Sequence, residues 1–594
     1  MKFDPFVLPF SIGLFILFVI VIVKFSMWIR RLPADDRNRL NKGIFSRKVF
    51  GAGWEIITES LFHRRVYRVN PLLGYMHMSF AFGWFMLIVL GNLESRLHAG
   101  TELNFPYYPI FFRFFVPGHV NIPWSGFFGF IMDFFLLYVI SGLMLAMFKR
   151  IYSRMFGMKK TTKMKLFDKF ALTSLWFIFP LRLLAESFTS GVHHGGSFLT
   201  GSLGDFFAGF LPVEPLSYVA WWAYSFALGI FFVSLPYSRY MHIPAEILLI
   251  GFRRFGINRY KRFGVFQEVE INSCPRCGVC IDVCQISTAA GIHDTQAVYF
   301  VKSLREKKKD EVIAQTCLVC GRCKEYCPVA IDTDSLRLSQ RTYLGGKKFF
   351  NYAYLPPVET KKVDVIYFAG CMTHLTPAIR KAMVGILDAS GVNYSFMDAD
   401  GSICCGRPLM LAGQYNDARN LIDQNKKIIQ ESGARRLVTS CPICFRVFNE
   451  DYKLDIEVLH HSQFISELLD NNILKSSISD KKVVYHDPCE LGRGSGIFDE
   501  PRKVIRNYAT LVQTPHEAEA GLCCGGSLGN IEKYNEVREK VSSQIVDELM
   551  NSCPDFLITS CPLCKKTLGK YAGTKVKDLA ELVYEGHKNG LLIN

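Results

Sequence analysis

Two short segments of this chain carry the same cysteine spacing. Residues 274–284 read CPRCGVCIDVC and residues 317–327 read CLVCGRCKEYC, so each is C-x2-C-x2-C-x3-C. A cubane 4Fe–4S cluster needs four thiolates around one small volume, and in paired motifs of this kind three come from one segment and the fourth from the other. The spacing therefore predicts two cubane 4Fe–4S clusters, one held by Cys274, Cys277, Cys280 and Cys327 and the other by Cys317, Cys320, Cys323 and Cys284.

The competing interpretation of these motifs is a zinc site. Pairs of C-x2-C also suit zinc, but eight cysteines in two copies of the longer spacing favour clusters. Gly278 and Gly321 are expected to relieve crowding where the backbone wraps a cluster. Gln285 stands where the first motif usually has a proline, a local departure that removes no ligand.

The cysteines are unevenly distributed along the chain. All 19 follow residue 273, whereas most of the 50 phenylalanines lie in the first 240 residues. A secreted disulfide framework would scatter cysteines through a small domain, and tight clusters in a large domain favour metal binding. A chain of 594 residues is too long for one core, and we predict four domains at 1–250, 251–350, 363–475 and 481–594.

Five apolar stretches precede residue 240, at 6–28, 71–93, 124–148, 166–188 and 216–238. Each is long enough to cross roughly 30 Å of hydrocarbon as a helix. Lys and Arg follow the first, third and fifth stretches, and the loops at 94–123 and 189–215 are nearly free of them. Because basic loops stay in the cytoplasm, we predict a multi-pass protein of the cytoplasmic (inner) membrane. Its N-terminus lies outside, and everything after residue 240 lies in the cytoplasm.

The net charge of +16 does not indicate nucleic acid as a partner. The basic clusters at 149–165 and 251–264 sit beside apolar runs, so anionic membrane lipid is the expected partner. The first apolar stretch is too long for a signal-peptide core and has no small-residue cleavage site after it, so we interpret it as a retained anchor.

Ionisable groups at membrane depth require an explanation. His77 lies in the cytoplasmic half of the second stretch and His242 just past the cytoplasmic end of the fifth. Two imidazoles from different helices suit axial ligation of a b-type haem, and His77 with His242 is the preferred pair. The alternative is that His77 is a buried hydrogen-bonded residue and His242 an interfacial one. Asp133, Arg182 and Glu186 either line a quinone pocket or neutralise one another.

The membrane half resembles the five-helix, dihaem gamma subunit of respiratory nitrate reductase and the membrane subunit of heterodisulfide reductases. The resemblance rests on helix number, topology, and the segments RRVYRVNPLLGYMH and LPYSRYMHI. It implies haem b and reaction with menaquinone or another quinone. That family has a further histidine early in the last helix, where this chain has Trp221, Trp222 and Tyr224, so one haem b is expected here, or two.

The C-terminal part is an internal repeat covering 363–470 and 481–591. LVTSCPIC matches LITSCPLC, ICCGR matches LCCGG, and each copy opens with an apolar run that ends near a cysteine. Copy one contains Cys371, Cys404, Cys405, Cys441 and Cys444, and copy two contains Cys489, Cys523, Cys524, Cys561 and Cys564. Alternating helical and β-rich runs predict α/β units with cysteines at the C-terminal ends of strands. Cys553 stands outside this register and is interpreted as an ordinary packed thiol.

These ten cysteines resemble the paired cysteine-rich CCG domains of heterodisulfide reductase catalytic subunits. The resemblance implies that each complete five-cysteine set is catalytic and binds a noncubane 4Fe–4S cluster, and that the pair can cleave a disulfide by one-electron steps. The alternative is that one copy is structural or binds an ordinary cubane. His486 and Asp487 could deliver protons or tune the cluster beside Cys489, or the Asp could have a capping and turn role.

The predicted fold is thus a five-helix all-α transmembrane bundle, an α-helical ferredoxin-type domain and duplicated α/β CCG domains. This plan resembles membrane-bound heterodisulfide reductase-like proteins and electron-transfer flavoprotein:menaquinone oxidoreductases. It implies a quinone-linked iron–sulfur oxidoreductase whose cytoplasmic partner is an electron-transfer flavoprotein or a dithiol/disulfide couple. The alternative is a non-catalytic wiring subunit for a separate flavin dehydrogenase of the lactate, glycolate or glycerol-3-phosphate type. No G-x-G-x-x-G opens a βαβ unit, so this chain is not expected to bind flavin or nicotinamide itself.

Overall fold

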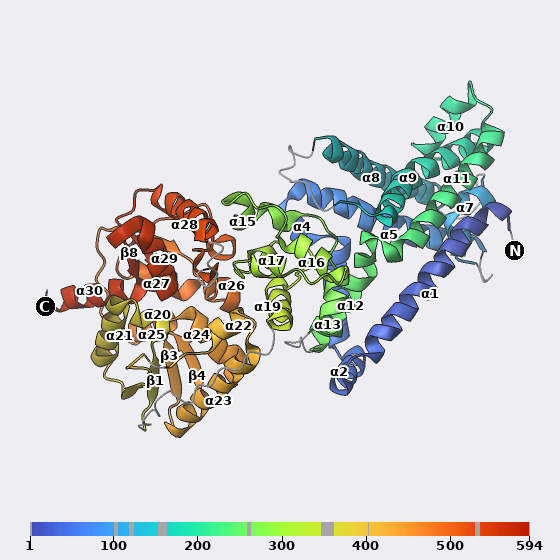
Figure 1. Ribbon diagram of the computed structural model, residues 1–594. Helices are drawn as coiled ribbons and strands as arrows, with labels where there is room; N and C mark the ends of the chain where they lie inside the picture. The colour runs from blue at the N-terminus through green and yellow to red at the C-terminus, as the bar shows by residue number, and fades with distance from the viewer. Residues whose placement is uncertain are drawn as a thin grey trace. The chain divides into compact units, whose positions relative to one another are not determined.

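The computed structural model describes residues 3–99, 105–117, 124–152, 163–257, 263–345, 362–401, 403–528 and 535–592. Much of the basic segment 149–165 and part of the segment 251–264 lie outside these ranges. The chain forms two compact units (Figure 1). The first comprises Met1–Tyr260, Gly264–Gly278 and Cys327–Ile331, and the second comprises Lys261–Phe263, Val279–Tyr326 and Asp332–Asn594.

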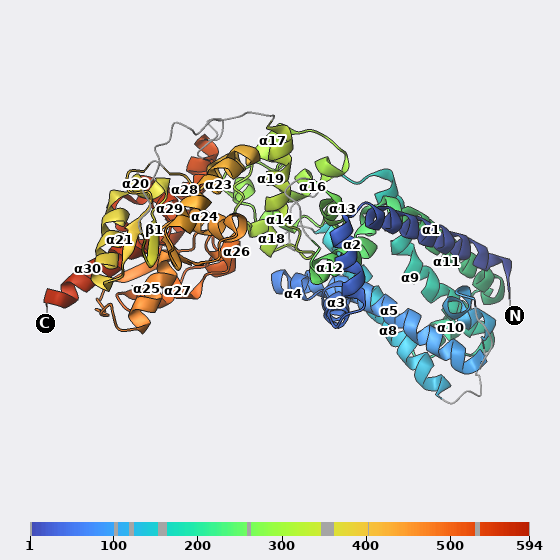
Figure 2. The ribbon, with the colours of Figure 1, turned by 90° about the horizontal axis from the view of Figure 1, so that it is seen from below.

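The first unit contains five helices that are long and apolar enough to cross a membrane. Their spans confirm the five apolar stretches predicted from sequence. Because their apolar residues are nearly continuous, these helices expose large hydrophobic side chains as well as burying them, as helices surrounded by lipid do. They are α1 (Leu8–Arg30), α5 (Pro71–Ala99), α8 (Ser125–Ile151), α9 (Leu166–His193) and α11 (Val213–Ser234) (Figure 2).

Small residues let two of these helices approach closely. A Cβ atom added to Gly13 of α1 would lie 2.8 Å from the Cα atom of Gly229 in α11. A Cβ added to Gly229 would in turn lie 2.5 Å from the carbonyl oxygen of Pro9. Close helix contacts through small residues are a common way to join membrane helices.

Shorter helices complete the first unit. Asp168 anchors the N-terminal end of α9, where its carboxylate accepts a hydrogen bond from the backbone N–H of Lys165 at 3.0 Å. The shorter helices are α2 (Ala34–Ile44), α3 (Lys48–Ile56), α4 (Arg64–Val69), α6 (Tyr107–Ile110), α7 (Phe112–Phe115), α10 (Thr200–Ala208), α12 (His242–Phe255) and α13 (Val265–Asn272).

The second unit begins with short helices around the second cysteine motif. These helices are short because the cysteine loops interrupt the chain. Asp310 and Asp332 cap two of them by accepting hydrogen bonds from the N–H groups of Ile313 and Ser335. The helices are α14 (Val279–Asp282), α15 (Gln285–Thr288), α16 (Ala297–Arg305), α17 (Glu311–Gln315), α18 (Arg322–Glu325) and α19 (Thr333–Leu344).

Each copy of the repeat forms a four-stranded parallel sheet with the same topology, as the repeat predicted. The orders are β2-β1-β3-β4 and β6-β5-β7-β8. In copy one the strands are β1 (Val365–Phe368), β2 (Tyr394–Phe396), β3 (Arg436–Thr439) and β4 (Glu457–His460). In copy two they are β5 (Lys482–His486), β6 (Thr510–Leu511), β7 (Phe556–Thr559) and β8 (Val576–Asp578).

The two copies share one hydrophobic core. It joins residues of β1 and β3 to residues of β5 and β7, and α21 (Pro377–Ser390) packs against α30 (Leu579–Leu592). This contact needs a glycine, because a Cβ on Gly385 would lie 2.2 Å from the ring of Tyr584. The remaining helices are α20 (Cys371–His374), α22 (Arg407–Leu411), α23 (Tyr415–Glu431), α24 (Pro442–Val447), α25 (His461–Asp470), α26 (Gly492–Ser495), α27 (Asp499–Arg506), α28 (Asn535–Met550) and α29 (Pro562–Ala572).

Candidate functional site

The cysteines of copy one follow the C-terminal ends of neighbouring strands. β1 and β3 are parallel and hydrogen-bonded, and Cys371 and Cys441 come within three residues of their ends. Gly370 has a φ of 85°, and a Cβ there would lie 2.9 Å from the Sγ atom of Cys444. At Gly370 the backbone therefore lies so close to the Cys444 thiol that only glycine fits there.

Copy two repeats this arrangement. Cys489 follows β5, Cys561 follows β7, and these two strands are also parallel neighbours. Cys561 caps α29, because its Sγ atom accepts a hydrogen bond from the N–H of Cys564 at 3.5 Å. The prediction that the cysteines lie at strand ends is confirmed for Cys371, Cys441, Cys489 and Cys561, whereas the adjacent pairs Cys404–Cys405 and Cys523–Cys524 lie in loops well beyond the ends of β2 and β6.

Both cysteine sets face a single cavity of about 130 Å³ in the second unit. Among the described residues, no three or more Cys, His, Asp or Glu side chains gather closely enough for a single metal ion. The thiols instead surround a volume, which suits a group of several iron atoms. The cavity is lined by nine of the ten motif cysteines, Cys371, Cys405, Cys441, Cys444, Cys489, Cys523, Cys524, Cys561 and Cys564, with Leu318 and Val319 of the second ferredoxin motif.

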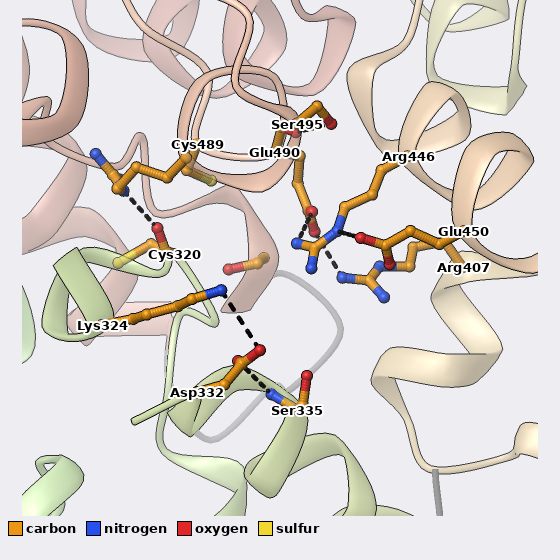
Figure 3. A network of polar contacts seen from close by, with 12 residues as sticks. Cys320, Lys324, Asp332, Ser335, Arg407, Arg446, Glu450, Cys489, Glu490 and Ser495 are labelled. Carbon is orange, nitrogen blue, oxygen red and sulfur yellow. Dashed lines mark hydrogen bonds and ion pairs between the residues drawn. The ribbon is translucent and has the colours of Figure 1, made fainter. Parts of the chain in front are cut away.

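A buried ion-pair network stands beside Cys489 (Figure 3). Glu490 accepts hydrogen bonds from Arg407 at 3.0 Å and from Arg446 at 2.7 Å. Burial raises the pKa of Glu490, but the charges of the two arginines outweigh burial and hold that pKa below its usual range. Arg407 and Arg446 belong to copy one and Glu490 to copy two, so the network joins the copies at the cavity wall.

The second ferredoxin motif lies in the second unit as far as Tyr326, and its last cysteine, Cys327, belongs to the first unit. Its thiols have protein partners: Cys317 accepts a hydrogen bond from the N–H of Val319 at 3.3 Å, and Cys323 lies 2.9 Å from the hydroxyl of Thr333. A hydrogen bond with the Cys523 thiol and the positive charge of Arg493 lower the pKa of Cys320 to about 5. Burial instead raises the pKa values of the Cys317 and Cys323 thiols.

The first ferredoxin motif falls in both units. Cys274, Cys277 and Cys327 belong to the first unit and Cys280 to the second. Burial raises the pKa of Cys327 to about 12, and Cys277 and Cys274 are near enough to raise it further. Arg276, between two of these cysteines, donates a hydrogen bond to Asp168 at 2.6 Å, so this loop is tied to the end of α9.

The two predicted haem histidines lie in the first unit, and His77 has charge interactions with both His63 and His242. The Nδ1 atom of His242 lies 2.8 Å from the carbonyl oxygen of Arg239. Donation from Nδ1 would leave the lone pair on Nε2, as a metal-ligating histidine needs.

His63 is a residue that the sequence prediction missed. Its ring lies 5.4 Å from that of His77, with the planes 18° apart. It has a φ of 52°, and burial lowers its pKa to about 4, so it is neutral at physiological pH. Its only sequence signal is a histidine directly before the RRVYRV helix.

The position where the sequence resemblance leads one to expect a further histidine is filled by aromatic packing. Trp221 is fully buried, packs against Phe6 and Phe111, and donates a hydrogen bond to the hydroxyl of Thr189 at 2.9 Å. This position therefore contributes packing to the bundle.

The ionisable side chains predicted at membrane depth have hydrogen-bond partners. Arg182 donates to Glu186 at 2.9 Å, and Asp133 accepts hydrogen bonds from the N–H groups of Leu199 and Thr200, both at 2.9 Å. Of the two alternatives for these residues, the structure shows mutual neutralisation for Arg182 and Glu186. Asp133 and Glu186 also line a small cavity with Arg113.

Asp487 has a structural role. It forms two hydrogen bonds with Arg502, both 2.7 Å long, and accepts a third from the N–H of Ala518 at 2.9 Å. His486 is buried beside Cys524. The prediction that Cys553 is a packed thiol is wrong: it is exposed, with a φ of 49°, at the position where copy one has Gly433 with a φ of 67°.

Glu246, on α12 outside the membrane spans, offers a test of electrostatics in the first unit. It is 7% exposed, and burial raises its pKa to about 8, with Glu59 and Glu55 adding to the effect and Arg253 and Arg65 opposing it. At pH values between the pKa of Glu246 in the unfolded chain and about 8, the folded protein keeps the carboxyl proton and the unfolded chain releases it. The free energy of unfolding therefore falls as the pH rises.

We expect Glu246→Gln to match the wild type in thermal stability near pH 4.5 and to exceed it by several degrees near pH 8. Thermal unfolding in detergent across this range measures the difference. Glu55→Gln is the control, because Glu55 is ion-paired with Arg253 and Arg254. A difference between Glu246→Gln and wild type that does not grow with pH would contradict this account.

Comparison with known families identifies the two cysteine modules. Residues 365–449 and 483–569 each match the family described as CCG, cysteine-rich domain. Residues 270–331 match the family described as 4Fe-4S dicluster domain. Both matches contain the cysteine motifs described above.

Several curated proteins are similar to this chain. A component of the dihydromethanophenazine:CoB–CoM heterodisulfide reductase of Methanosarcina acetivorans is 28% identical over 52% of this chain and 90% of that protein. The EtfAB:quinone oxidoreductase of Syntrophomonas wolfei is 21% identical over 90% of both chains. The probable iron-sulfur-binding oxidoreductase FadF of Bacillus subtilis is 20% identical over 62% of this chain and 68% of that protein. The chain is therefore an iron–sulfur oxidoreductase with two CCG domains and a 4Fe–4S dicluster domain, related to this heterodisulfide reductase component and to EtfAB:quinone oxidoreductase.

Proposed function

We propose that this protein transfers electrons between the menaquinone pool and a cytoplasmic electron-transfer flavoprotein. The observation that carries the proposal is the single cavity lined by nine motif cysteines from both CCG copies, on a chain that also has five helices able to span a membrane. The relative named EtfAB:quinone oxidoreductase supports this choice, because its similarity extends over 90% of the chain.

Each cysteine has a proposed role. The eight ferredoxin-motif thiols hold two cubane clusters, and the five thiols of each CCG copy hold a noncubane cluster. When bound, these groups supply one-electron carriers. The protein holds them in fixed positions and excludes water: Cys405, Cys441 and Cys444 in copy one, and Cys523, Cys524, Cys561 and Cys564 in copy two, are buried.

The proposed location is the cytoplasmic (inner) membrane, with the N-terminus outside and the iron–sulfur domains in the cytoplasm. The support is the placement of Lys and Arg beside the apolar stretches. Quinone would react within the membrane bundle, and a haem b held by His77 and His242 would relay its electrons.

We expect His77→Ala and His242→Ala each to abolish haem binding and leave iron–sulfur content unchanged. The reason is that axial ligation of a b-type haem by two imidazoles needs both. A pyridine haemochrome assay with total non-haem iron measures both quantities. His63→Ala is the comparison, because His63 lies against His77. Retention of full haem content by both ligand variants would contradict the assignment.

The function is tested with the purified full-length protein in detergent or liposomes. Reduced electron-transfer flavoprotein is mixed anaerobically with a water-soluble menaquinone analogue, and quinone reduction is followed by absorbance. We expect turnover with no further subunit. Turnover only after a separate flavin dehydrogenase is added would support the wiring-subunit function instead.

A further inference from the structure

A glutamine of the ferredoxin region binds the backbone of a copy-two cysteine at two points. The side-chain Nε2 of Gln285 donates to the carbonyl oxygen of Cys523 at 3.1 Å, and its Oε1 accepts from the N–H of Cys523 at 2.6 Å. Gln285 is 2% exposed and directly follows Cys284. A proline, usual at this place in the motif, could form neither bond through its side chain.

A second link runs from an arginine of copy two to the backbone of the second ferredoxin motif. Arg493 donates from Nε to the carbonyl oxygen of Cys320 at 2.7 Å. From Nη1 it donates to the carbonyl oxygen of Gly521 at 2.6 Å, two residues before Cys523. One partly buried guanidinium therefore fixes the second ferredoxin loop and the loop that carries the copy-two cysteine pair.

Apolar packing seals the same junction. Ile286, Leu318, Cys523 and Val541 are buried together, with Cys284, Cys320 and Cys489 packed against them. The hydroxyl of Ser527 donates to the carbonyl oxygen of Leu318 at 2.5 Å. The second ferredoxin motif and copy two are thus joined by apolar packing as well as by hydrogen bonds.

Copy one meets the ferredoxin region differently. Arg341 donates to the carbonyl oxygen of Cys317 at 3.1 Å and to that of Leu411 at 3.0 Å, and Leu411 lies seven residues beyond Cys404. Cys371 of copy one is exposed, whereas its counterpart Cys489 is partly buried. The bond from Arg341 therefore reaches copy one seven residues beyond Cys404, whereas Gln285 binds the backbone of Cys523 itself.

We propose that Gln285 and Arg493 are positioning residues that couple copy two to the second ferredoxin motif. The proposal rests on the proposed function and makes copy two the CCG copy that exchanges electrons with the second ferredoxin motif. Each transfer between sites moves one electron, and no bond forms or breaks. The partner or the quinol supplies the electrons according to direction.

The test uses the full-length protein with Gln285→Leu, which keeps the side-chain size and removes both hydrogen bonds. After stepwise reduction with dithionite, without quinone or flavoprotein, electron paramagnetic resonance measures the magnetic coupling between the second ferredoxin centre and the copy-two centre. Rapid-freeze samples give the rate at which the copy-two centre is reduced. Because the two hydrogen bonds hold the Cys523 backbone against the ferredoxin region, we expect that rate to fall several-fold, with weaker coupling.

The matched control is Asn425→Leu. Asn425 is 4% exposed and donates to the carbonyl oxygen of Cys404 at 2.9 Å, so it also supports the backbone of a motif cysteine, but in copy one. We expect it to alter the copy-one signal and leave the coupling between copy two and the ferredoxin centre unchanged. Equal effects of Asn425→Leu and Gln285→Leu on that coupling would overturn the proposal.

Two milder variants keep the proposal testable if Gln285→Leu fails to assemble the copy-two centre. Gln285→Glu retains only the bond accepted from Cys523 N–H, and Arg493→Lys retains charge but not the two-point contact. We expect intermediate rates from both, and wild-type rates and coupling in both would overturn the proposal. Because these measurements need no quinone or flavoprotein, they remain decisive if the turnover assay refutes the proposed function.

Discussion

Replacing Cys441 or Cys561 with serine is expected to remove one iron–sulfur centre and to reduce flavoprotein–quinone turnover to background. Each residue is buried and follows a central strand of its own CCG sheet, and each lines the shared cavity. Four clusters contain about 16 iron atoms, so each variant should lose about four. Iron and acid-labile sulfide analysis measures the loss, and the turnover assay measures its effect.

Cys553→Ser is the control for both variants, because Cys553 is exposed and stands outside both cysteine sets. It should keep the wild-type iron content and activity. If Cys441→Ser retained its iron while Cys561→Ser lost about four atoms, or the reverse, one copy would hold no cluster. The proposal of two noncubane clusters would then be wrong.

Glu490→Ala is expected to destabilise the second unit by about 3–5 kcal/mol, because breaking a buried ion pair leaves uncompensated charge. Glu490 is the shared partner of Arg407 and Arg446, and its removal leaves two buried guanidinium groups without their carboxylate. Denaturant unfolding of the full-length protein, followed by the loss of cluster absorbance, measures the change.

Glu450→Ala is the matched control for this prediction. Glu450 also pairs with Arg446, at 2.9 Å, but its side chain is 49% exposed. An exposed pair contributes roughly 0–1 kcal/mol, so this variant should remain close to the wild type. Equal effects of the two variants would show that burial of Glu490 is not what makes the network important.

The sequence predicted the features that depend on local pattern. Apolar length predicted the five long apolar helices, and the repeated CCG and SCPxC segments predicted two similar parallel sheets with Cys371, Cys441, Cys489 and Cys561 at strand ends. These predictions succeed because helix length and strand placement follow from residues close together in the chain.

Contacts between distant segments could not be predicted in this way. Gln285 was recognised as a departure from the motif, but its partner Cys523 is 238 residues away. Glu490 likewise lies 83 residues from Arg407, and nothing in the local sequence of either indicates the pair. The register of the repeat places Cys553 outside both cysteine sets and predicts a packed thiol, whereas it lies exposed in a left-handed turn.

The most direct test of the account is metal analysis of the anaerobically purified wild-type protein combined with electron paramagnetic resonance. The account predicts about 16 non-haem iron atoms with matching sulfide, in four centres, two of them with signals unlike those of ordinary cubanes. A protein that contains zinc, or that shows only the two ferredoxin centres, would contradict it.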